Sequence, residues 1–575
     1  MRVRVATLSV VAPTLGVVNE TAASSASTGV FYGVLTGVAR PFREPGVDAH
    51  DGLPFNAPLG VPLFDGNLER IRVDSAAFGL APIDVATGAT VTNVIGPLHY
   101  GDRTPTILVS QAPTVSASAA NAAAATAPAP RSTEFTAATV NAGRLFDTTD
   151  SPDHTDAVPT SAAVTRRLAK LSLQIRNVLR SPDFVAVQEV ETLALLQSLA
   201  SRINSDATAA GQANPGYQAY LIDGLDASGL DVGLLVRTTR VTVQQVTQEG
   251  REATFVDPLT LTTEILNDRP PLVVRATVAL PSGPVPVTLV ITHLRSLRDS
   301  ADWAGGERVR AKRAAQAEFL AGLIQDRQAA AAGEPLVVLG DFNAYPFNDG
   351  YVDVVGTAAG APVDPSQVTV GTTDLVEPNL SDALAGLEAA TRYTVTDGGN
   401  AAALHHVLVN GAAAAIQSRA WVAHVNADFP DALRNDASRA ERAAGADVPV
   451  VYFEVAPAQP EPPQTGPREI TGQVRVKVWR SQYFWHYRGV TFALVDVTNL
   501  SNKTIDGPFV LGIGGLPAGA SVNNARGTVA GLPAVPVFWW HQLRPGRTMR
   551  AWVVLKGVPV STTPTVRVFA GKLAK

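Results

Sequence analysis

The sequence contains no cysteine among its 575 residues, and this absence excludes disulfide bonds and zinc sites with cysteine ligands. Charged residues are also scarce, at 17% of the chain, and the formal net charge is −5. That balance argues against a protein whose whole surface coats polyanions, while a local basic groove stays compatible with it. No run of residues is long and apolar enough to span a bilayer, so we expect no stable membrane insertion.

Apolar residues, glycine and proline are what the sequence does contain. Hydrophobic residues make up 46% of it, enough for sizeable cores, and 47 glycines and 41 prolines favour strands and turns. The length predicts two to four domains. Two segments lack the apolar periodicity of a core, an Ala/Ser/Pro linker at residues 110–131 and a proline-rich linker at 456–467. We therefore predict folded domains at 1–109, 132–455 and 468–575.

The N-terminal piece is rich in valine, isoleucine and threonine between turn signals, which predicts short strands and a small β-barrel. Its pattern resembles the oligonucleotide/oligosaccharide-binding (OB) fold. Two interpretations stay open: a purely structural module, or a nucleic-acid-binding one in which Tyr32, Phe42 and Arg43 stack on bases. The first residues, MRVRVATLSVVAP, lack a clear cleavage site, so we interpret them as a strand rather than a signal peptide.

The C-terminal piece, residues 468–575, contains several short alternating runs such as MRAWVVLKGV and TVRVFAG. Short strands at regular spacing predict an antiparallel β-sandwich, and NLSNKTIDGPF is similar to a segment of immunoglobulin-like modules. A surface for adhesion or self-association is the alternative to a purely structural sandwich. Five of the seven tryptophans lie here, and we expect most of them in the core: Trp479, Trp485, Trp539, Trp540 and Trp552.

The central piece mixes helices and strands. Residues 161–180 and 308–328 show apolar residues at helical spacing. PDFVAVQEVE predicts a buried strand that ends in Gln188 and Glu189, and LVVLGDFN predicts another that ends at Asp341. Polar side chains at strand ends around one core are typical of an α/β catalytic domain.

Three of these stretches, PDFVAVQEVE, ITHLRS and LVVLGDFN, resemble the motifs of the endonuclease/exonuclease/phosphatase family. TVNAGRLFD, at residues 139–147, resembles the opening strand of that family. AHVNADFPDALRND, at 423–436, resembles a segment of the large bacterial extracellular endonucleases within it. The resemblance implies a four-layer sandwich, two packed β-sheets flanked by helices, and an extracellular or cell-surface protein that acts on nucleic acid or another phosphoester.

The resemblance also implies roles for single residues in a hydrolysis that depends on Mg²⁺ or Mn²⁺. Glu189 would be the main metal ligand, assisted by Asn141 and Asp341, since hard cations take carboxylate and amide oxygens. Asp341 would also orient or deprotonate the attacking water. His293 would donate to a phosphate oxygen, and Asn343 would hold either the phosphate or the geometry of the base pair. The charge that develops on the phosphate must be stabilised.

The sequence departs from the family at its closing motif, Ser-Asp-His-Asp-Pro-Val, whose histidine contacts the phosphate and is oriented by a distant aspartate. The corresponding stretch here, AAGADVPVVYFEV, contains Asp447 and no histidine. None of the nine histidines lies between His424 and His486. The aspartate is also replaced, because His405 stands in its place in the late strand LHHV. Loss of such a pair is expected to lower the rate about 10²- to 10³-fold.

Two hypotheses follow from this departure. In the first, the chain is a nuclease-family phosphodiesterase whose activity is impaired, and His405, His406 or His424 has taken over the vacated place. In the second, it is a catalytically inactive surface or structural protein that uses the nuclease fold as a scaffold and the C-terminal sandwich for contacts. The three histidines are also candidates for binding a transition metal.

Overall fold

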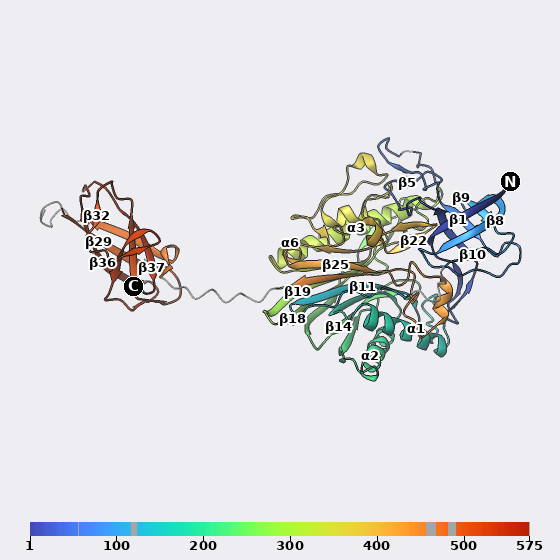
Figure 1. The fold of residues 1–575 in the computed structure, drawn as a ribbon, viewed down its shortest axis with the longest axis horizontal. Coiled ribbons are helices and arrows are strands. Elements are labelled where there is room, and N and C mark those ends of the chain that lie inside the picture. Colours follow the sequence, from blue (N-terminus) through green and yellow to red (C-terminus); the bar gives the residue numbers. More distant parts are fainter. Residues whose placement is uncertain (56, 117–122, 456–466, 481–489, 560, 574–575) are drawn as a thin grey trace. The chain divides into compact units, whose positions relative to one another are not determined.

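The structure is a computed structural model that describes residues 1–55, 57–116, 123–455, 467–480, 490–559 and 561–573 (Figure 1). The chain divides into two compact units, Met1–Pro457 and Ala458–Lys575. The first unit contains both the N-terminal strands and the central α/β domain. The predicted proline-rich linker at 456–467 lies almost wholly outside the described residues, and the predicted domain limits remain a prediction. No helix among the described residues is long and apolar enough to cross a membrane.

The N-terminal strands close into a five-stranded barrel, as predicted. The order is β1-β4-β7-β9-β8, and β8 pairs back onto β1. Most of MRVRVATLSVVAP forms strand β1, and β10 from the predicted linker adds to β8. The strands are β1 (Arg2–Ala12), β4 (Val30–Leu35), β7 (Ile71–Asp74), β8 (Thr90–Gly101), β9 (Thr104–Leu108) and β10 (Thr114–Val115), with two short pairs, β2 (Gly16–Asn19) with β3 (Ser24–Ser27) and β5 (Val47–Asp48) with β6 (Leu63–Phe64).

Two six-stranded sheets face each other in the central domain, and the apolar residues between them form one core. Each sheet is antiparallel except for one pair, β11–β12 in the first and β19–β20 in the second. The first sheet has the order β13 (Tyr217–Leu221), β14 (Asp231–Arg237), β12 (Phe184–Val190), β11 (Glu134–Leu145), β26 (Val448–Glu454), β25 (Gln417–Ala423). The second has the order β15 (Val241–Gln248), β18 (Leu272–Leu280), β19 (Gly283–His293), β20 (Leu336–Asp341), β24 (His405–Val409), β21 (Ser381–Asp382).

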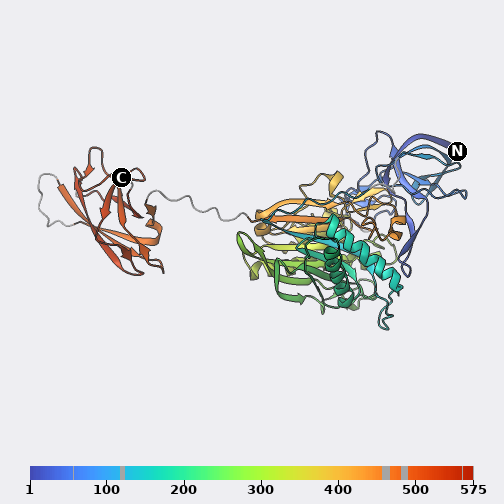
Figure 2. The same cartoon turned by 60° about the horizontal axis from the view of Figure 1, so that its bottom comes forward.

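Helices cover the outer face of each sheet, which confirms the predicted α/β sandwich (Figures 1 and 2). Helices α1 and α2 pack on the first sheet, and α3 and α4 pack on the second. Strands with both faces covered are apolar throughout, which explains the unbroken runs FVAV and LVVL. The helices are α1 (Ser161–Leu173) with a π-helical end (Gln174–Val178), α2 (Leu193–Ala209), α3 (Gly306–Ala330), α4 (Val354–Ala359), α5 (Ala389–Arg392) and α6 (Gly411–Ile416).

Shorter elements connect these layers. Thr160 and Thr192 cap the starts of α1 and α2 by accepting the backbone N–H three residues ahead. The remaining strands and 3-10 turns of the first unit are β16 (Thr254–Val256), β17 (Thr263–Ile265), β22 (Val395–Asp397), β23 (Asn400–Ala402), η3 (Pro365–Gln367) and η4 (Asp431–Asn435).

The second unit is a β-sandwich with its own core between two sheets. Its immunoglobulin-like character remains a prediction. The expectation that most of its tryptophans are buried is wrong for Trp479, Trp539 and Trp552, which are 46%, 84% and 49% exposed, and Trp485 lies outside the described residues. One sheet is β27 (Arg468–Glu469), β37 (Thr565–Ala570), β31 (Phe509–Gly514), β34 (Leu532–Val537), β33 (Thr528–Val529). The other is β28 (Val474–Arg480), β29 (Val490–Asn499), β36 (Thr548–Lys556), β32 (Ser521–Val522), and β30 (Ile505–Asp506) pairs with β35 (Gln542–Leu543).

Candidate active site

Three adjacent strands of the second sheet place His293, Asp341 and His405 side by side. The parallel register of β19 and β20 pairs His293 with Asp341, and the antiparallel register of β20 and β24 pairs Asp341 with His405. The Asp341 Oδ2 atom lies 3.8 Å from His293 Nε2 and 3.5 Å from His405 Nε2. All three side chains are buried. Gly340 is required before Asp341 because a Cβ there would lie 1.9 Å from the Thr292 carbonyl oxygen.

The first sheet completes the cluster with Asn141 and Glu189. The Asn141 amide nitrogen donates to Glu189 Oε1 at 2.9 Å and to Asp341 Oδ2 at 3.0 Å, so it bridges the two sheets. Glu189 sits where the register of β12 shifts, with a φ of 61°. Such a bulge re-aims a side chain at the end of a strand, which explains why Glu189 departs from the alternation of its neighbours. The structure thus brings together five candidate residues from five strands.

The electrostatics of the cluster favour an ionised Asp341. Burial alone would raise its pKa, but the His405 and His293 rings, the backbone N–H of Asn343 and the Asn141 amide together lower it. Burial and the neighbouring Arg269 lower the pKa of His293 to about 3, so this imidazole is neutral at pH 7. Arg269 Nη1 lies 3.0 Å from both ring nitrogens of His293. At neutral pH His293 carries no charge, so the hydrogen bonds from the Asn343 N–H and the Asn141 amide still favour the ionised form of Asp341.

Asn343 forms the turn that follows Asp341. Its backbone N–H donates to Asp341 Oδ1 at 2.9 Å, and its side-chain amide donates to the Leu294 carbonyl at 3.0 Å. Arg313 holds the same turn from helix α3, because its Nη1 donates to the carbonyls of Asn343 and Arg295, both at 2.8 Å. Arg313 is only 2% exposed, whereas the sequence pattern gave no reason to bury one arginine of α3 in preference to its neighbours.

The other two candidate histidines have different partners. His406 is paired with Gly340 in the sheet, so its side chain lies on the opposite face from His405, where its ring nitrogens meet Asp382 Oδ2 at 2.8 Å and the Ala344 carbonyl at 2.9 Å. His424 Nδ1 lies 2.8 Å from Asp447 Oδ2, and its ring stacks on Tyr393 at a centroid distance of 4.1 Å. Of the three, His405 is the histidine whose ring nitrogen lies near Asp341, with Nε2 3.5 Å from Oδ2 and not hydrogen-bonded to it.

Asp447 lies in the stretch that corresponds to the family-like closing motif, and it anchors a turn. Its Oδ1 atom accepts the backbone N–H groups of Val425, Asn426 and Ala427 at 3.0, 2.7 and 2.8 Å. Its Oδ2 atom holds His424, and the residue is 1% exposed. A carboxylate that accepts four donors in the protein interior fixes the backbone around it. The stretch AHVNADFP is therefore shaped by Asp447.

The donor set suits a metal ion that keeps most of its water. Among the described residues no group of three or more His, Asp and Glu side chains is arranged to hold a metal, which also leaves the proposed histidine-only metal site without support. Glu189 is a half-buried carboxylate at the edge of the cluster. Mg²⁺ commonly takes one or two carboxylates and fills its remaining positions with water and phosphate oxygens. The residues present fit such an ion, and they do not form an all-protein cage.

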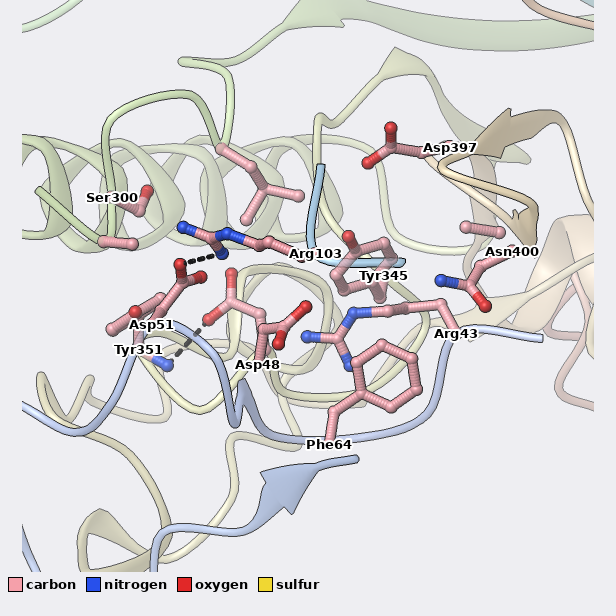
Figure 3. A pocket seen from close by; sticks show the side chains of 14 residues that line it. Arg43, Asp48, Asp51, Phe64, Arg103, Ser300, Tyr345, Tyr351, Asp397 and Asn400 are labelled. Carbon is pink, nitrogen blue, oxygen red and sulfur yellow. Dashed lines mark hydrogen bonds and ion pairs between the residues drawn. The ribbon is translucent and has the colours of Figure 1, made fainter. Parts of the chain in front are cut away.

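A pocket of about 250 Å³ adjoins the turn after Asp341 (Figure 3). One wall comes from the N-terminal strands and loops, including Arg43, Phe64 and Arg103, and the other from Tyr345 and Tyr351 of the central domain. The Arg43 guanidinium lies 4.2 Å from the centroid of the Phe64 ring and 4.8 Å from that of Tyr345. Arg43, a candidate for stacking on bases, is thus already stacked on rings of the protein itself.

The N-terminal segment is joined to the central domain by backbone hydrogen bonds at this pocket. The Arg43 N–H donates to the Ala401 carbonyl at 2.9 Å, and the Ala401 N–H donates to the Pro41 carbonyl at 3.0 Å. Asn67 Nδ2 donates to Asn400 Oδ1 at 2.8 Å. The segments that connect the barrel strands therefore contribute a wall beside the candidate site, a role that no local sequence pattern indicates.

Glu191, two residues after Glu189, is a buried acid that no sequence pattern indicates. It is 3% exposed, and mainly because of this burial its pKa is raised to about 7. The Asp147 and Asp156 carboxylates also raise the pKa, whereas the hydrogen bond from the Asp147 N–H lowers it. One of its oxygens and both oxygens of Asp156 are buried without a hydrogen-bond partner. Carboxylates crowded in this way favour the protonated form.

Replacing Glu191 by glutamine is expected to raise the free energy of unfolding by about 2 to 3 kcal/mol at about pH 8 and to change it little at about pH 4. The pKa of Glu191 is higher in the folded chain, about 7, than its ordinary value of 4.5. The folded state thus binds the proton more tightly, and wild-type stability falls as the pH rises from 4.5 to about 7. Urea denaturation at both pH values measures the difference, with Glu252→Gln as an exposed control. An equal gain at both pH values would show that titration of Glu191 is not the cause.

Comparison with known proteins identifies the central domain. The model of the Endonuclease/Exonuclease/phosphatase family matches residues 138–438. No curated protein matches the chain. Similar solved structures include humanized D. rerio TDP2 (14% identity, TM-score 0.34, covering 56% of this chain and 100% of that one) and an endonuclease/exonuclease/phosphatase from Bacteroides vulgatus (14%, 0.34, 56% and 100%). The human Nocturnin catalytic domain with bound sulfate is another (15%, 0.34, 57% and 96%). Because the family model spans more than half of the sequence, the chain belongs to the endonuclease/exonuclease/phosphatase family.

Proposed function

We propose that this chain is a metal-dependent phosphodiesterase that acts on nucleic acid, with a rate limited by the altered closing motif. The observation that carries the proposal is the Asn141 amide, which joins Glu189 of one sheet to Asp341 of the other. An amide that donates to two carboxylates holds both acids at the same end of the sandwich. Membership of the family and the AHVNADFP segment support nucleic acid as the substrate.

Each residue of the cluster has a distinct part in the proposed reaction. Glu189 would hold a divalent cation such as Mg²⁺ or Mn²⁺, which supplies charge to stabilise the phosphate in the transition state. Asp341, kept ionised by its hydrogen bonds, would orient a water molecule and accept its proton. His293 is neutral and contacts Arg269. The Arg269 guanidinium, held in place by this contact, would bind a phosphate oxygen.

Two features support the proposed weakness of the activity. Asp447, which stands at the place either of the family's phosphate-binding histidine or of the aspartate beside it, accepts three backbone N–H groups. The stretch AAGADVPVVYFEV offers no imidazole that could donate to a phosphate. His405 stands where the family has the orienting aspartate and lies against Asp341. A missing donor of this kind lowers a rate by about 10²- to 10³-fold. Proximity to Asp341 makes His405 the candidate that compensates in part.

Metal-dependent cleavage tests the proposal directly. Labelled DNA and RNA should be cleaved slowly in Mg²⁺ or Mn²⁺ and not in EDTA. Glu189→Gln should raise the metal concentration needed for cleavage by about tenfold or more, since it removes the carboxylate proposed as the main metal ligand. The exposed Glu252→Gln should behave as the wild type. The metal should also raise the melting temperature of the wild type more than that of Glu189→Gln. Absence of both cleavage and the metal-dependent melting shift would favour the scaffold hypothesis.

A further inference from the structure

The outer face of one sheet in the second unit carries a row of large apolar side chains. Trp479 of β28, Leu494 of β29 and Trp552 of β36 are direct neighbours across three strands, because Trp479 pairs with Leu494 and Leu494 with Trp552. Trp479 and Trp552 are 46% and 49% exposed. The residues that alternate with this row, such as Ala493 and Val553, point into the core. We call Trp479, Leu494 and Trp552 the aromatic row.

Cations lie one side-chain level away on the same face. Lys477 pairs with Asp496, and Asp496 with Arg550, so these three side chains form the neighbouring row. Arg475 lies one level further along β28 and is exposed. On the other side of the aromatic row the next level is apolar, with Phe492 opposite Val554. The face therefore combines an apolar platform with a basic margin.

Hydrogen bonds hold the indole of Trp479 in place. Its Nε1–H donates to Asp496 Oδ2 at 2.8 Å, and Arg550 donates to both oxygens of Asp496 at 2.7 and 3.1 Å. Lys477 Nζ lies 3.7 Å from the centroid of the Trp479 ring. The indole is thus held in one orientation, which lowers the entropy lost on binding a planar ligand that displaces the Lys477 ammonium from the ring face.

The charge of the second unit is opposite to that of the whole chain. Residues 458–575 hold fourteen Lys and Arg and four Asp and Glu, a formal net charge of +10, whereas the whole chain carries −5. The overall charge, which argued against a polyanion-binding surface, thus hides a strongly basic unit joined to an acidic one. A basic unit of this kind attracts polyanions over a distance of about 10 Å at ordinary ionic strength.

We propose that this sheet face binds single-stranded nucleic acid. Bases would stack on Trp479 and Trp552, which are two strand spacings apart, about 9.6 Å. Phosphates would contact the margin formed by Arg475, Lys477 and Arg550. Stacking requires base faces that a duplex conceals, and the charge of +10 favours a polyanion over a neutral sugar chain. The choice of nucleic acid rests on the proposed function of the first unit, to which this surface would deliver substrate.

Binding of a fluorescein-labelled oligothymidylate of about 20 nucleotides to the full chain, followed by anisotropy in EDTA, tests the inference. EDTA prevents metal-dependent cleavage, so binding is measured whether or not the first unit is an active nuclease. Trp479→Ala/Trp552→Ala should weaken binding about 10- to 100-fold, and Trp479→Phe/Trp552→Phe should stay within about 3-fold of the wild type. The double variant Arg475→Ala/Lys477→Ala should reduce the slope of the logarithm of the binding constant against the logarithm of the salt concentration by about 1.4 in magnitude.

Controls separate this surface from other exposed aromatics and from charge alone. Trp539→Ala removes an 84% exposed tryptophan that follows β34 of the other sheet, and it should leave the dissociation constant within about 2-fold. The inference is overturned if the two alanine changes in the aromatic row have no effect, if Trp539→Ala matters as much, or if duplex DNA or heparin binds as tightly as the single strand. Intact binding together with absent cleavage in Mg²⁺ would refute only the proposed function.

Discussion

Cleavage of labelled DNA or RNA is expected to fall about 10²- to 10⁴-fold in an Asp341→Asn chain, with the fold retained. Asparagine keeps the shape of the side chain and can still accept the bond from Asn141, which is 3.0 Å long. It cannot take a proton from water, and it no longer offers a charge to the neighbouring imidazoles. The measurement is the initial rate in saturating Mg²⁺ or Mn²⁺, with the melting temperature of each chain recorded beside it.

Asp382→Asn is the matched control for this experiment. Asp382 also pairs with a histidine, His406, at 2.8 Å in the same sheet, but on the face away from Asp341. Its replacement should leave the rate within about 3-fold, as expected for a change outside the reacting groups. A rate that is unchanged in Asp341→Asn, or equally reduced in both chains, would remove Asp341 from the proposed reaction.

Asp447→Ala is expected to lower the free energy of unfolding by about 3 to 5 kcal/mol relative to the wild type. The change leaves the backbone N–H groups of Val425, Asn426 and Ala427 without their acceptor and removes the partner of His424. Asp447→Asn should cost less, because its carbonyl oxygen can still accept the three N–H groups. Urea denaturation measures the loss, and amide hydrogen exchange at residues 425–427 should speed up in the alanine variant.

Asp436→Ala provides the comparison for a carboxylate in a similar local role. Asp436 accepts the backbone N–H of Ser438 at 2.9 Å but is exposed, so its loss should cost less than about 1 kcal/mol. If Asp447→Ala were equally mild, Asp447 would not be a structural anchor. Its position in the closing motif would then call for another explanation, such as a direct part in binding substrate.

The strands of the central domain could be predicted because their signals are local. FVAVQEV and LVVLGD are short apolar runs that end in polar residues, and each is a buried strand, Phe184–Val190 and Leu336–Asp341. The helix predicted at 161–180 begins at Ser161 and continues into a π-helical turn that ends at Val178. Patterns of this kind depend only on which faces of an element are covered.

Residues whose role depends on contacts between distant segments could not be predicted. Arg313 looks like any other basic residue of its helix, yet it is buried and holds the turn at Asn343 from 30 positions away. Glu191 has the same sequence context as Glu189, but the β12 bulge leaves one half-buried at the cluster and the other fully buried beside Asp156. A one-residue change of register decides between these two environments.

The exposed tryptophans of the second unit illustrate the same limit. Tryptophan in an alternating strand favours a core position by size alone, and Trp479 and Trp552 are instead on the outer face. The alternation of β28 and β36 specifies which residues share a face, but it does not say which face the sandwich covers. Only the packing of the second sheet against Ala493 and Val553 settles that.

The sequence by itself determined the family, two helices and several buried strands of the central domain, and the residue types at the ends of those strands. These follow from the apolar periodicity and from the polar residues that interrupt it. The tertiary structure decided what those residues do: that Asn141 joins Glu189 to Asp341, that His405 rather than His406 or His424 faces Asp341, and that Asp447 anchors a turn. Strand register and bulges place these side chains, and they are set by the packing of whole sheets, which no short stretch of sequence contains.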